Sequence, residues 1–262
     1  MGKTIYQVDA FTSTPFKGNP AGVMIWDTLP TEEYMHNIAM EMNLSETAFL
    51  SPDNGRFKIR FYTPEKEIDL CGHATLSSAH ILFEQGMAAD NIEFISKAGP
   101  LHIRKEGDLI VMNFPKYSYS RREIPEELIR GAGFTPQELY DCDYDWKLAL
   151  LKDEMEVRDA RPDFNAIREA GFGDLMITAP SSSREYDFVV RCFVPEMGID
   201  EDPVTGSAHC ALTPFWSEKL GRKSFRSYQA SARGGYLDVS IKGDRVEIAG
   251  TAVTVMKGEF LI

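Results

Sequence analysis

The segment Phe57-Lys-Ile-Arg-Phe-Tyr-Thr-Pro-Glu65 has a pattern that returns as Phe188-Val-Val-Arg-Cys-Phe-Val-Pro-Glu196, and this repeat is the main sequence evidence for the fold. Each copy continues to an Ile-Asp pair, at Ile68 and at Ile199. The two copies keep one spacing, since 188 − 57 and 199 − 68 both give 131 residues. Matches in the same order at one spacing indicate an internal duplication, with too few copies for a solenoid.

Each copy then reaches a glycine turn, Gly72-His-Ala in the first and Gly206-Ser-Ala in the second. Here the spacing is 206 − 72 = 134, so the second copy has gained three residues. We place the gain between Ile199 and Gly206, where it introduces Asp202. Downstream, the segments 99–108 and 235–244 both read as β-hairpins with a Gly-Asp turn.

Both halves follow the order strand, glycine turn, apolar helix and hairpin. Antiparallel hairpins around one apolar helix predict an α+β fold rather than a doubly wound parallel sheet. The predicted domains are residues 1–115, with the last residues 252–262 joining them, and residues 116–251. A duplicated fold usually carries its active site between the copies, so we expect a cleft there.

Charge and composition exclude several classes of partner. The chain has 262 residues and a net charge of −12. Nucleic acid and anionic membranes both require basic patches, so neither is an expected partner. No apolar run approaches the roughly 18 residues that a transmembrane helix needs, and Met1–Val8 follows a strand pattern rather than that of a signal peptide.

The four cysteines show no pairing typical of disulfides or zinc, since no Cys-x-x-Cys or Cys/His cluster is present. We therefore expect a reduced, cytoplasmic protein without a metal. Nucleotide-binding glycine loops and the Gly-x-Ser-x-Gly element of hydrolases are absent as well, so no cofactor is predicted.

The two glycine turns are the first candidates for a binding site. Gly72 and Gly206 each open a predicted helix, and a helix N-terminus presents N–H groups and a positive dipole end to an anion. Glycine also lets a ligand approach the backbone closely. The alternative is an ordinary helix entry with a small residue for packing.

Two residues of the first half are candidates for proton transfer. Glu46 ends the turn Asn43-Leu-Ser-Glu, and a glutamate in a dry pocket has a raised pKa that suits a general acid/base. His73 follows Gly72 and is a candidate proton carrier or orienting donor. Alternatively, Glu46 is a capping or edge-strand residue and His73 a surface or capping residue.

The second half offers Asp202 and Ser207. Asp202 precedes Pro203 and either forms a plain turn or orients His73 or a substrate amine. Ser207 either satisfies backbone donors at the helix start or binds a substrate carboxylate.

Four motifs carry a family resemblance that spans the chain in order: Asp9–Ala21, Asn43–Phe49, Asp69–Thr75 and Glu201–His209. Together they resemble the PhzF-like phenazine-biosynthesis isomerase family. The resemblance implies the diaminopimelate-epimerase fold, with two pseudo-symmetric halves that each wrap a mixed, mainly antiparallel sheet around a central helix. It also implies a homodimer.

The resemblance further implies cofactor-independent proton transfer. Glu46 matches the acid/base that moves a proton between carbons of a small unsaturated cyclic amino- or hydroxy-carboxylate. His73, Asp202 and Ser207 match supporting residues. The N–H groups after Gly72 and Gly206 would hold the substrate carboxylate, and Asn19 of the first motif is assigned to substrate binding.

Two alternatives stay open. Epimerases and racemases of this fold use two opposed cysteines, and Cys71 stands where the first would be, whereas the residues before Gly206 include no cysteine. This favours an isomerase, with Cys71 as a packing residue. The other alternative is a non-catalytic small-molecule-binding member of the family, which would have no need of the proton carriers.

Overall fold

The computed structural model describes residues 2–169, 171–195 and 199–261. Glu196, the last residue of the repeated stretch, lies outside them. Contacts divide the chain into two compact units, Met1–Phe114 with Ile248–Ile262 (unit 1) and Pro115–Glu247 (unit 2). Each unit combines a mixed sheet with a few helices, so the predicted α+β class is confirmed.

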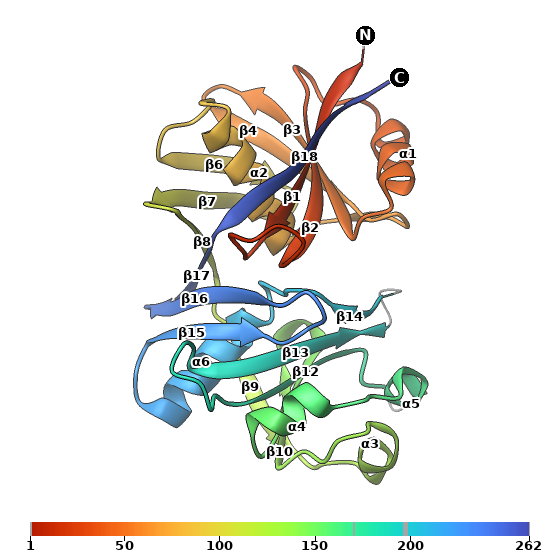
Figure 1. The fold of residues 1–262 in the computed structure, drawn as a ribbon, viewed down its shortest axis with the longest axis vertical. Helices are drawn as coiled ribbons and strands as arrows, with labels where there is room; N and C mark the ends of the chain where they lie inside the picture. The colour runs from red at the N-terminus through yellow and green to blue at the C-terminus, as the bar shows by residue number, and fades with distance from the viewer. Residues whose placement is uncertain (1, 170, 196–198, 262) are drawn as a thin grey trace. The chain divides into compact units, whose positions relative to one another are not determined.

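Unit 1 is built on a sheet in the order β18–β1–β2–β3–β4–β6–β7. The pairs β2–β3 and β4–β6 are parallel and the others antiparallel. The C-terminal strand lies along the first strand, as Figure 1 shows in blue and red. The strands are β1 (Lys3–Ala10), β2 (Asn19–Ile25), β3 (Glu46–Asp53), β4 (Arg56–Tyr62), β5 (Glu67–Ile68), β6 (Asn91–Ser96), β7 (Gly99–Glu106), β8 (Leu109–Pro115) and β18 (Ala252–Phe260).

Helix α2 (Gly72–Glu84) is the centre of unit 1. It packs on β1, β2, β3 and β18, and it is buried on nearly every side. Its small polar residues fit there because Thr75 and Ser78 donate their hydroxyls to the carbonyls of Cys71 and Ala74, one turn earlier. Helix α1 (Glu32–Met42) contacts β3 and β4 and lies outside the curved sheet (Figure 1).

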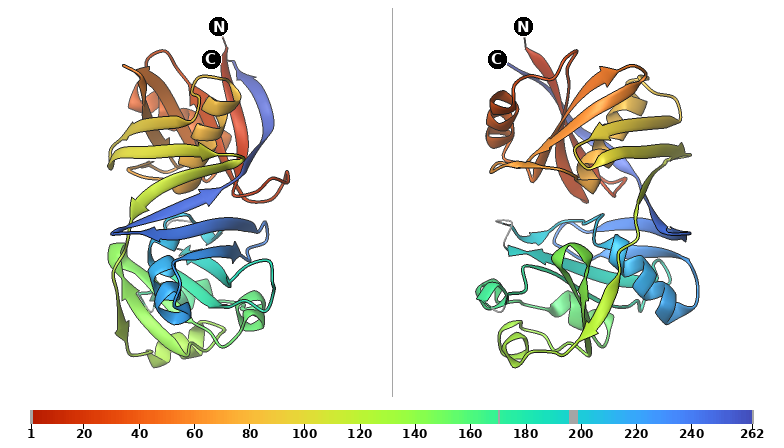
Figure 2. Two further views of the ribbon diagram at one scale, coloured as in Figure 1. Left: turned by 90° about the vertical axis from the view of Figure 1, so that its left-hand side faces the viewer. Right: turned by 180° about the vertical axis from the view of Figure 1, so that it is seen from behind.

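Unit 2 has the sheet order β9–β10–β11–β12–β13–β15–β16, with β11–β12 and β13–β15 parallel. Helix α6 packs on β15 and β16 (Figure 2). The strands are β9 (Tyr119–Arg122), β10 (Glu138–Cys142), β11 (Trp146–Leu150), β12 (Asp174–Pro180), β13 (Phe188–Val194), β14 (Ile199–Asp202), β15 (Ser224–Gln229), β16 (Gly235–Lys242) and the first half of β17 (Arg245–Gly250), whose residues from Ile248 onward belong to unit 1. The helices are α3 (Glu126–Gly131), α4 (Glu154–Asp159), α5 (Phe164–Glu169) and α6 (His209–Leu220), with a 3-10 turn η1 (Asp143–Asp145).

The two units share one succession of parallel and antiparallel pairings, which is what an internal duplication predicts. Strand register then corrects the position of the three extra residues. Phe61 pairs with Ile68, whereas its counterpart Cys192 pairs with Asp202. Asp202 therefore takes the place of Ile68 and is not an inserted residue. The extra residues fall earlier, after Phe193, where the ladder shifts register.

One ion pair recurs at matching places in both units. Arg60 on β4 binds Glu67 on β5, and Arg191 on β13 binds Glu201 on β14 through two nitrogen–oxygen contacts of 2.7 and 2.9 Å. Arg191 also donates to the carbonyl oxygens of Val157 and Ala160, at the end of α4. This bidentate pair fixes the strand that leads into Asp202.

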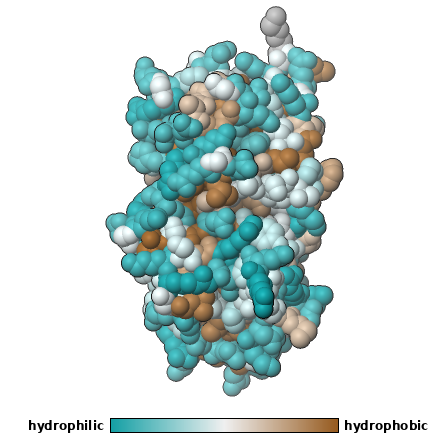
Figure 3. Space-filling view, turned by 60° about the vertical axis from the view of Figure 1, so that its left-hand side comes forward, coloured by the Kyte–Doolittle hydropathy of each residue, from teal (hydrophilic) through white to brown (hydrophobic). Residues whose placement is uncertain are grey.

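The surface shown in Figure 3 is mostly hydrophilic, with small scattered hydrophobic areas. None of the helices within the described residues is both long and apolar enough to cross a membrane.

We predict that Arg191→Met destabilises the protein more than Arg60→Met. The Arg191 side chain is 10% exposed, and its loss leaves Glu201 and two carbonyls without their donor, at a cost of about 3–5 kcal/mol. Arg60 is 20% exposed, and Lys97 still neutralises Glu67 when Arg60 is replaced. Urea unfolding of the two variants measures the difference, and an equal or larger loss for Arg60→Met would contradict it.

Candidate functional site

Three predicted site residues meet at one edge of unit 1. Because β2 and β3 run parallel, their first residues, Asn19 and Glu46, lie at the same edge of the sheet. Helix α2 begins at Gly72 against these strands and brings His73, in its first turn, to that edge. The prediction that Gly72 opens a helix is confirmed.

The side chains of this group touch one another. Nε2 of His73 lies 2.8 Å from Oε2 of Glu46, and Nδ1 lies 3.2 Å from Nδ2 of Asn19. All three residues are buried, with exposed fractions of 8% for Glu46, 5% for His73 and 0% for Asn19. A histidine–carboxylate contact in so dry a place is electrostatically strong, because little water screens it.

The contact between His73 and Glu46 is close but poorly aligned. Oε2 of Glu46 is buried and receives no hydrogen bond of good geometry. If the amide N–H of Asn19 points at Nδ1, a neutral His73 carries its proton on Nε2 and faces the carboxylate. Turning the amide by 180° would place a carbonyl at Nδ1 and suit a doubly protonated ring. In either state Nε2 carries a proton close to Glu46, but the angle does not make an aligned hydrogen bond.

Cys71 is a further member of the group. Its sulfur lies 3.5 Å from Nδ1 and 3.8 Å from Nε2 of His73. Burial first, and then the charge of Glu46, raise the pKa of the Cys71 thiol, so it stays protonated at neutral pH. From the sequence we expect Cys71 to be a packing residue, and only its place two residues before His73 hints at the contact.

The pKa of His73 is held well above its ordinary 6.5. Burial by itself acts the other way and lowers this pKa, but the contact with Cys71 and the negative charge of Glu46 outweigh it. The site therefore contains an imidazole that keeps a proton near neutral pH, beside a buried carboxyl group.

The loop before Asn19 is shaped by its glycine. Gly18 has a left-handed backbone, with φ of +65°, and a Cβ there would lie 2.0 Å from the carbonyl oxygen of Ala10. Asp9 supports the same loop by accepting a hydrogen bond of 2.8 Å from the backbone N–H of Phe16. Only glycine fits at position 18, so the loop delivers Asn19 to the sheet edge in a fixed way.

The other predicted residues, Asp202, Gly206 and Ser207, share one turn of unit 2. The carboxylate of Asp202 accepts a hydrogen bond from the hydroxyl of Thr205. The buried amide of Gln229 binds both ends of this turn. It accepts from the Thr205 N–H at 2.8 Å and donates to the Asp202 carbonyl oxygen at 2.8 Å. No sequence pattern points to Gln229, because it lies far downstream on β15.

The prediction that Gly206 opens a helix is wrong by three residues. Helix α6 begins at His209. Residues 206–208 form a tighter turn, in which the N–H groups of His209 and Cys210 bond to the carbonyls of Gly206 and Ser207. Within the described residues, neither Gly72 nor Gly206 has a positive φ, so the backbone conformation does not by itself require glycine at either place.

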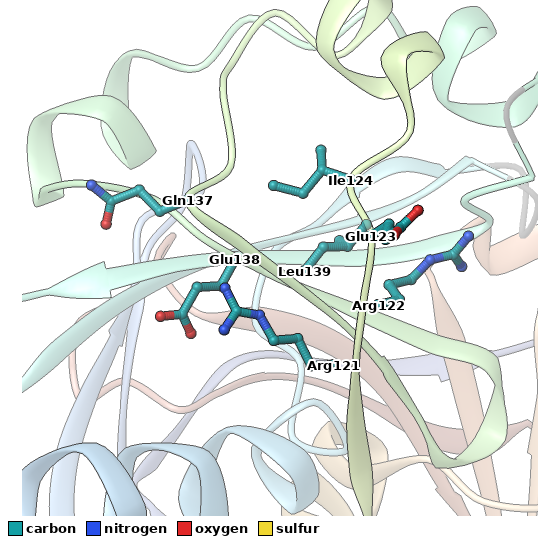
Figure 4. A pocket seen from close by; sticks show the side chains of 7 residues that line it. All are labelled: Arg121, Arg122, Glu123, Ile124, Gln137, Glu138 and Leu139. Carbon is teal, nitrogen blue, oxygen red and sulfur yellow. The ribbon is translucent and has the colours of Figure 1, made fainter.

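One surface pocket of unit 2, of about 460 Å³, lies apart from these residues (Figure 4). Its lining consists of Arg121, Arg122, Glu123, Ile124, Gln137, Glu138 and Leu139. Two of these charges are already paired, Arg122 with Asp141 and Glu138 with Lys219. The lining of this pocket includes none of the predicted site residues.

Comparison with known proteins agrees with this fold and motif set. The chain is 44% identical to an uncharacterized isomerase of Halalkalibacterium halodurans over 100% of both chains. A crystal structure of a PhzF family phenazine biosynthesis protein from Enterococcus faecalis matches with a TM-score of 0.95 and 40% identity, covering 100% of both chains.

A probable proline racemase of Agrobacterium radiobacter shares the fold, with a TM-score of 0.65 at 12% identity, over 99% of this chain and 93% of the other. The predicted diaminopimelate epimerase-like fold class is thereby confirmed. The family model described as phenazine biosynthesis-like protein matches residues 8–258. The chain therefore belongs to the phenazine biosynthesis-like protein family.

Proposed function

We propose that this protein is an isomerase that moves a proton between two carbons of a small unsaturated cyclic amino- or hydroxy-carboxylate, with Glu46 as the acid/base and no cofactor. The observation that carries the proposal is the buried Glu46–His73 pair at the N-terminal end of α2. Relatives that carry the name isomerase support the reaction class.

The chemistry follows from the poorly satisfied carboxylate. Oε2 of Glu46 is buried without an aligned donor, so it is available to accept a proton from carbon. As this C–H bond breaks, its electron pair shifts through the conjugated system toward the substrate carboxylate. Glu46 then returns the proton to a different carbon, so substrate and product have the same composition.

The negative charge that builds up on the substrate needs stabilisation. The N–H groups at the start of α2, next to Gly72, are suited to a substrate carboxylate because this helix end carries a partial positive charge. His73 keeps a proton and adds positive charge beside Glu46. Asn19 fixes the orientation of the His73 ring.

We further propose that Asp202, Gly206 and Ser207 of unit 2 take part in substrate binding. Their shared turn, held by Gln229, supports this role because it presents a carboxylate and a hydroxyl at fixed places. A homodimer and a cytoplasmic location complete the proposal. Size-exclusion chromatography with light scattering tests the dimer.

The site favours this reaction over epimerisation. By the strand register, Thr205 occupies in unit 2 the place that Cys71 has in unit 1, since 205 − 71 equals the spacing 206 − 72. An epimerase with two thiols needs the second cysteine at that place to deliver a proton to the opposite face. A single carboxyl carrier instead suits removal and return of a proton at two carbons.

We predict that Glu46→Gln abolishes proton transfer. The wild-type protein, incubated in deuterium oxide with a panel of cyclohexadiene carboxylates, incorporates carbon-bound deuterium into an active substrate. The variant loses at least about 100-fold in this rate, because the amide cannot accept the proton. Glu41→Gln, at an exposed position of α1, is the matched control and keeps the wild-type rate. Equal deuterium incorporation by wild type and Glu46→Gln would refute the role of Glu46.

We also predict that two of the five histidines have pKa values shifted in opposite directions from that of an ordinary histidine. His73 keeps its proton well above pH 6.5, whereas burial lowers the pKa of His209 to about 4, against the weaker opposing effect of the hydrogen bond that His209 donates to the Thr205 carbonyl oxygen. Nitrogen-15 NMR of histidine-labelled protein measures both. Glu46→Gln lowers the pKa of His73 and leaves His209 unchanged, and an unchanged His73 in that variant would show that Glu46 does not hold its proton.

A further inference from the structure

A cysteine, a histidine and a carboxylate lie together at the edge of unit 1. The possible ligand atoms of Glu46, Cys71 and His73 all fall within 4.8 Å of one another, and all three residues are buried. We propose that these residues form a binding site for a thiophilic divalent cation such as Zn²⁺, and that the bound cation blocks the acid/base. The blocking effect rests on the proposed function, whereas the binding does not.

The distances fit a small tetrahedral ion. Zinc binds sulfur at about 2.3 Å and imidazole nitrogen at about 2.0 Å, so neighbouring ligand atoms around it are roughly 3.5 Å apart. The Cys71 sulfur is 3.8 Å from Nε2 of His73, and Nε2 is 2.8 Å from Oε2 of Glu46. Changes of about half an ångström, within the reach of small side-chain rotations, would bring both spacings to the ideal.

A second observation points to a cation. Oε2 of Glu46 has no aligned hydrogen-bond donor although its side chain is only 10% exposed. A buried carboxylate oxygen in this situation is stabilised by any cation that reaches it. The geometry thus combines an under-satisfied anion with two of the ligand types that zinc prefers.

The surroundings of His73 also suit a metal ligand. A histidine that binds a metal through Nε2 carries its proton on Nδ1 and donates it to a neighbouring acceptor. Asn19 stands 3.2 Å from Nδ1, and its amide, turned by 180°, offers a carbonyl oxygen there. The same residue that orients His73 in the proposed reaction would therefore orient it toward the cation.

The ligand set selects among cations. Thiolate and imidazole favour Zn²⁺, Cd²⁺ and Co²⁺ over Mg²⁺ and Ca²⁺, which prefer oxygen. As the metal binds, the thiol of Cys71 and Nε2 of His73 each release a proton to solvent. Glu46 then donates its oxygen to the metal and is no longer available to accept a proton from substrate.

Cobalt titration of the purified full-length protein, freed of metal with a chelator, tests the proposal. Co²⁺ bound at this site gives a sulfur-to-cobalt charge-transfer band in the near ultraviolet that saturates at one equivalent and is displaced by Zn²⁺ but not by Mg²⁺. Cys71→Ser loses this band. Cys210→Ser, which removes a buried thiol of unit 2, is the matched control and keeps it.

Glu46→Gln keeps the sulfur and imidazole ligands and is expected to weaken cobalt binding at least tenfold without abolishing the band. Circular dichroism verifies that each variant is folded. A wild-type protein without the band, or a band that survives Cys71→Ser, overturns the proposal. Because the titration uses no substrate, its result is independent of the deuterium experiment: a cobalt band with no isomerase activity supports the metal site and refutes the proposed function alone.

Discussion

The contact between Glu46 and His73 is the central interaction of the candidate site. A carboxylate and an imidazole, 2.8 Å apart and nearly sealed from water, influence each other strongly because solvent does not screen them. The close but unaligned geometry leaves the carboxylate able to take up a proton. The same features suit the pair to a soft cation, so the proposed proton transfer and the proposed metal binding would compete for the same oxygen.

The scaffold creates this contact through a small set of constraints. A parallel pair of strands brings the starts of β2 and β3 to one edge, and the buried helix α2 begins against them. Gly18 permits the tight loop that delivers Asn19. Because α2 packs on several strands at once, its first turn is fixed, and His73 has little freedom to leave Glu46.

Much of this fold can be predicted from the sequence, because the repeat lies in strands. Their alternation of apolar and polar residues is visible in a short stretch of sequence. The α+β class follows from it, and so does the role of Gly72 as a helix start. Strand register is harder to predict from the sequence. A register shift after Phe193 changes the position of the three extra residues and makes Asp202 the counterpart of Ile68. A register shift arises from pairing between strands, which the order of residues alone does not reveal.

In the candidate site, too, some features can be predicted from the sequence and others cannot. Motifs identify Glu46 and His73, but the contact of Cys71 with His73 and the clamp by Gln229 depend on tertiary packing. The tight turn before α6 also escapes prediction, since a helix start and a 3-10 turn use the same residue types. Structure therefore adds the partners of the motif residues rather than the motif residues themselves.

The most direct test of a single carboxyl carrier is the stereochemistry of proton transfer. The substrate identified by deuterium incorporation is labelled with deuterium on one face of the carbon that loses its proton, and the face on which the new proton arrives is determined by NMR of the product. One carrier on one side of the substrate predicts removal and delivery on the same face. Delivery on the opposite face would require a second acid and would contradict the central role of Glu46.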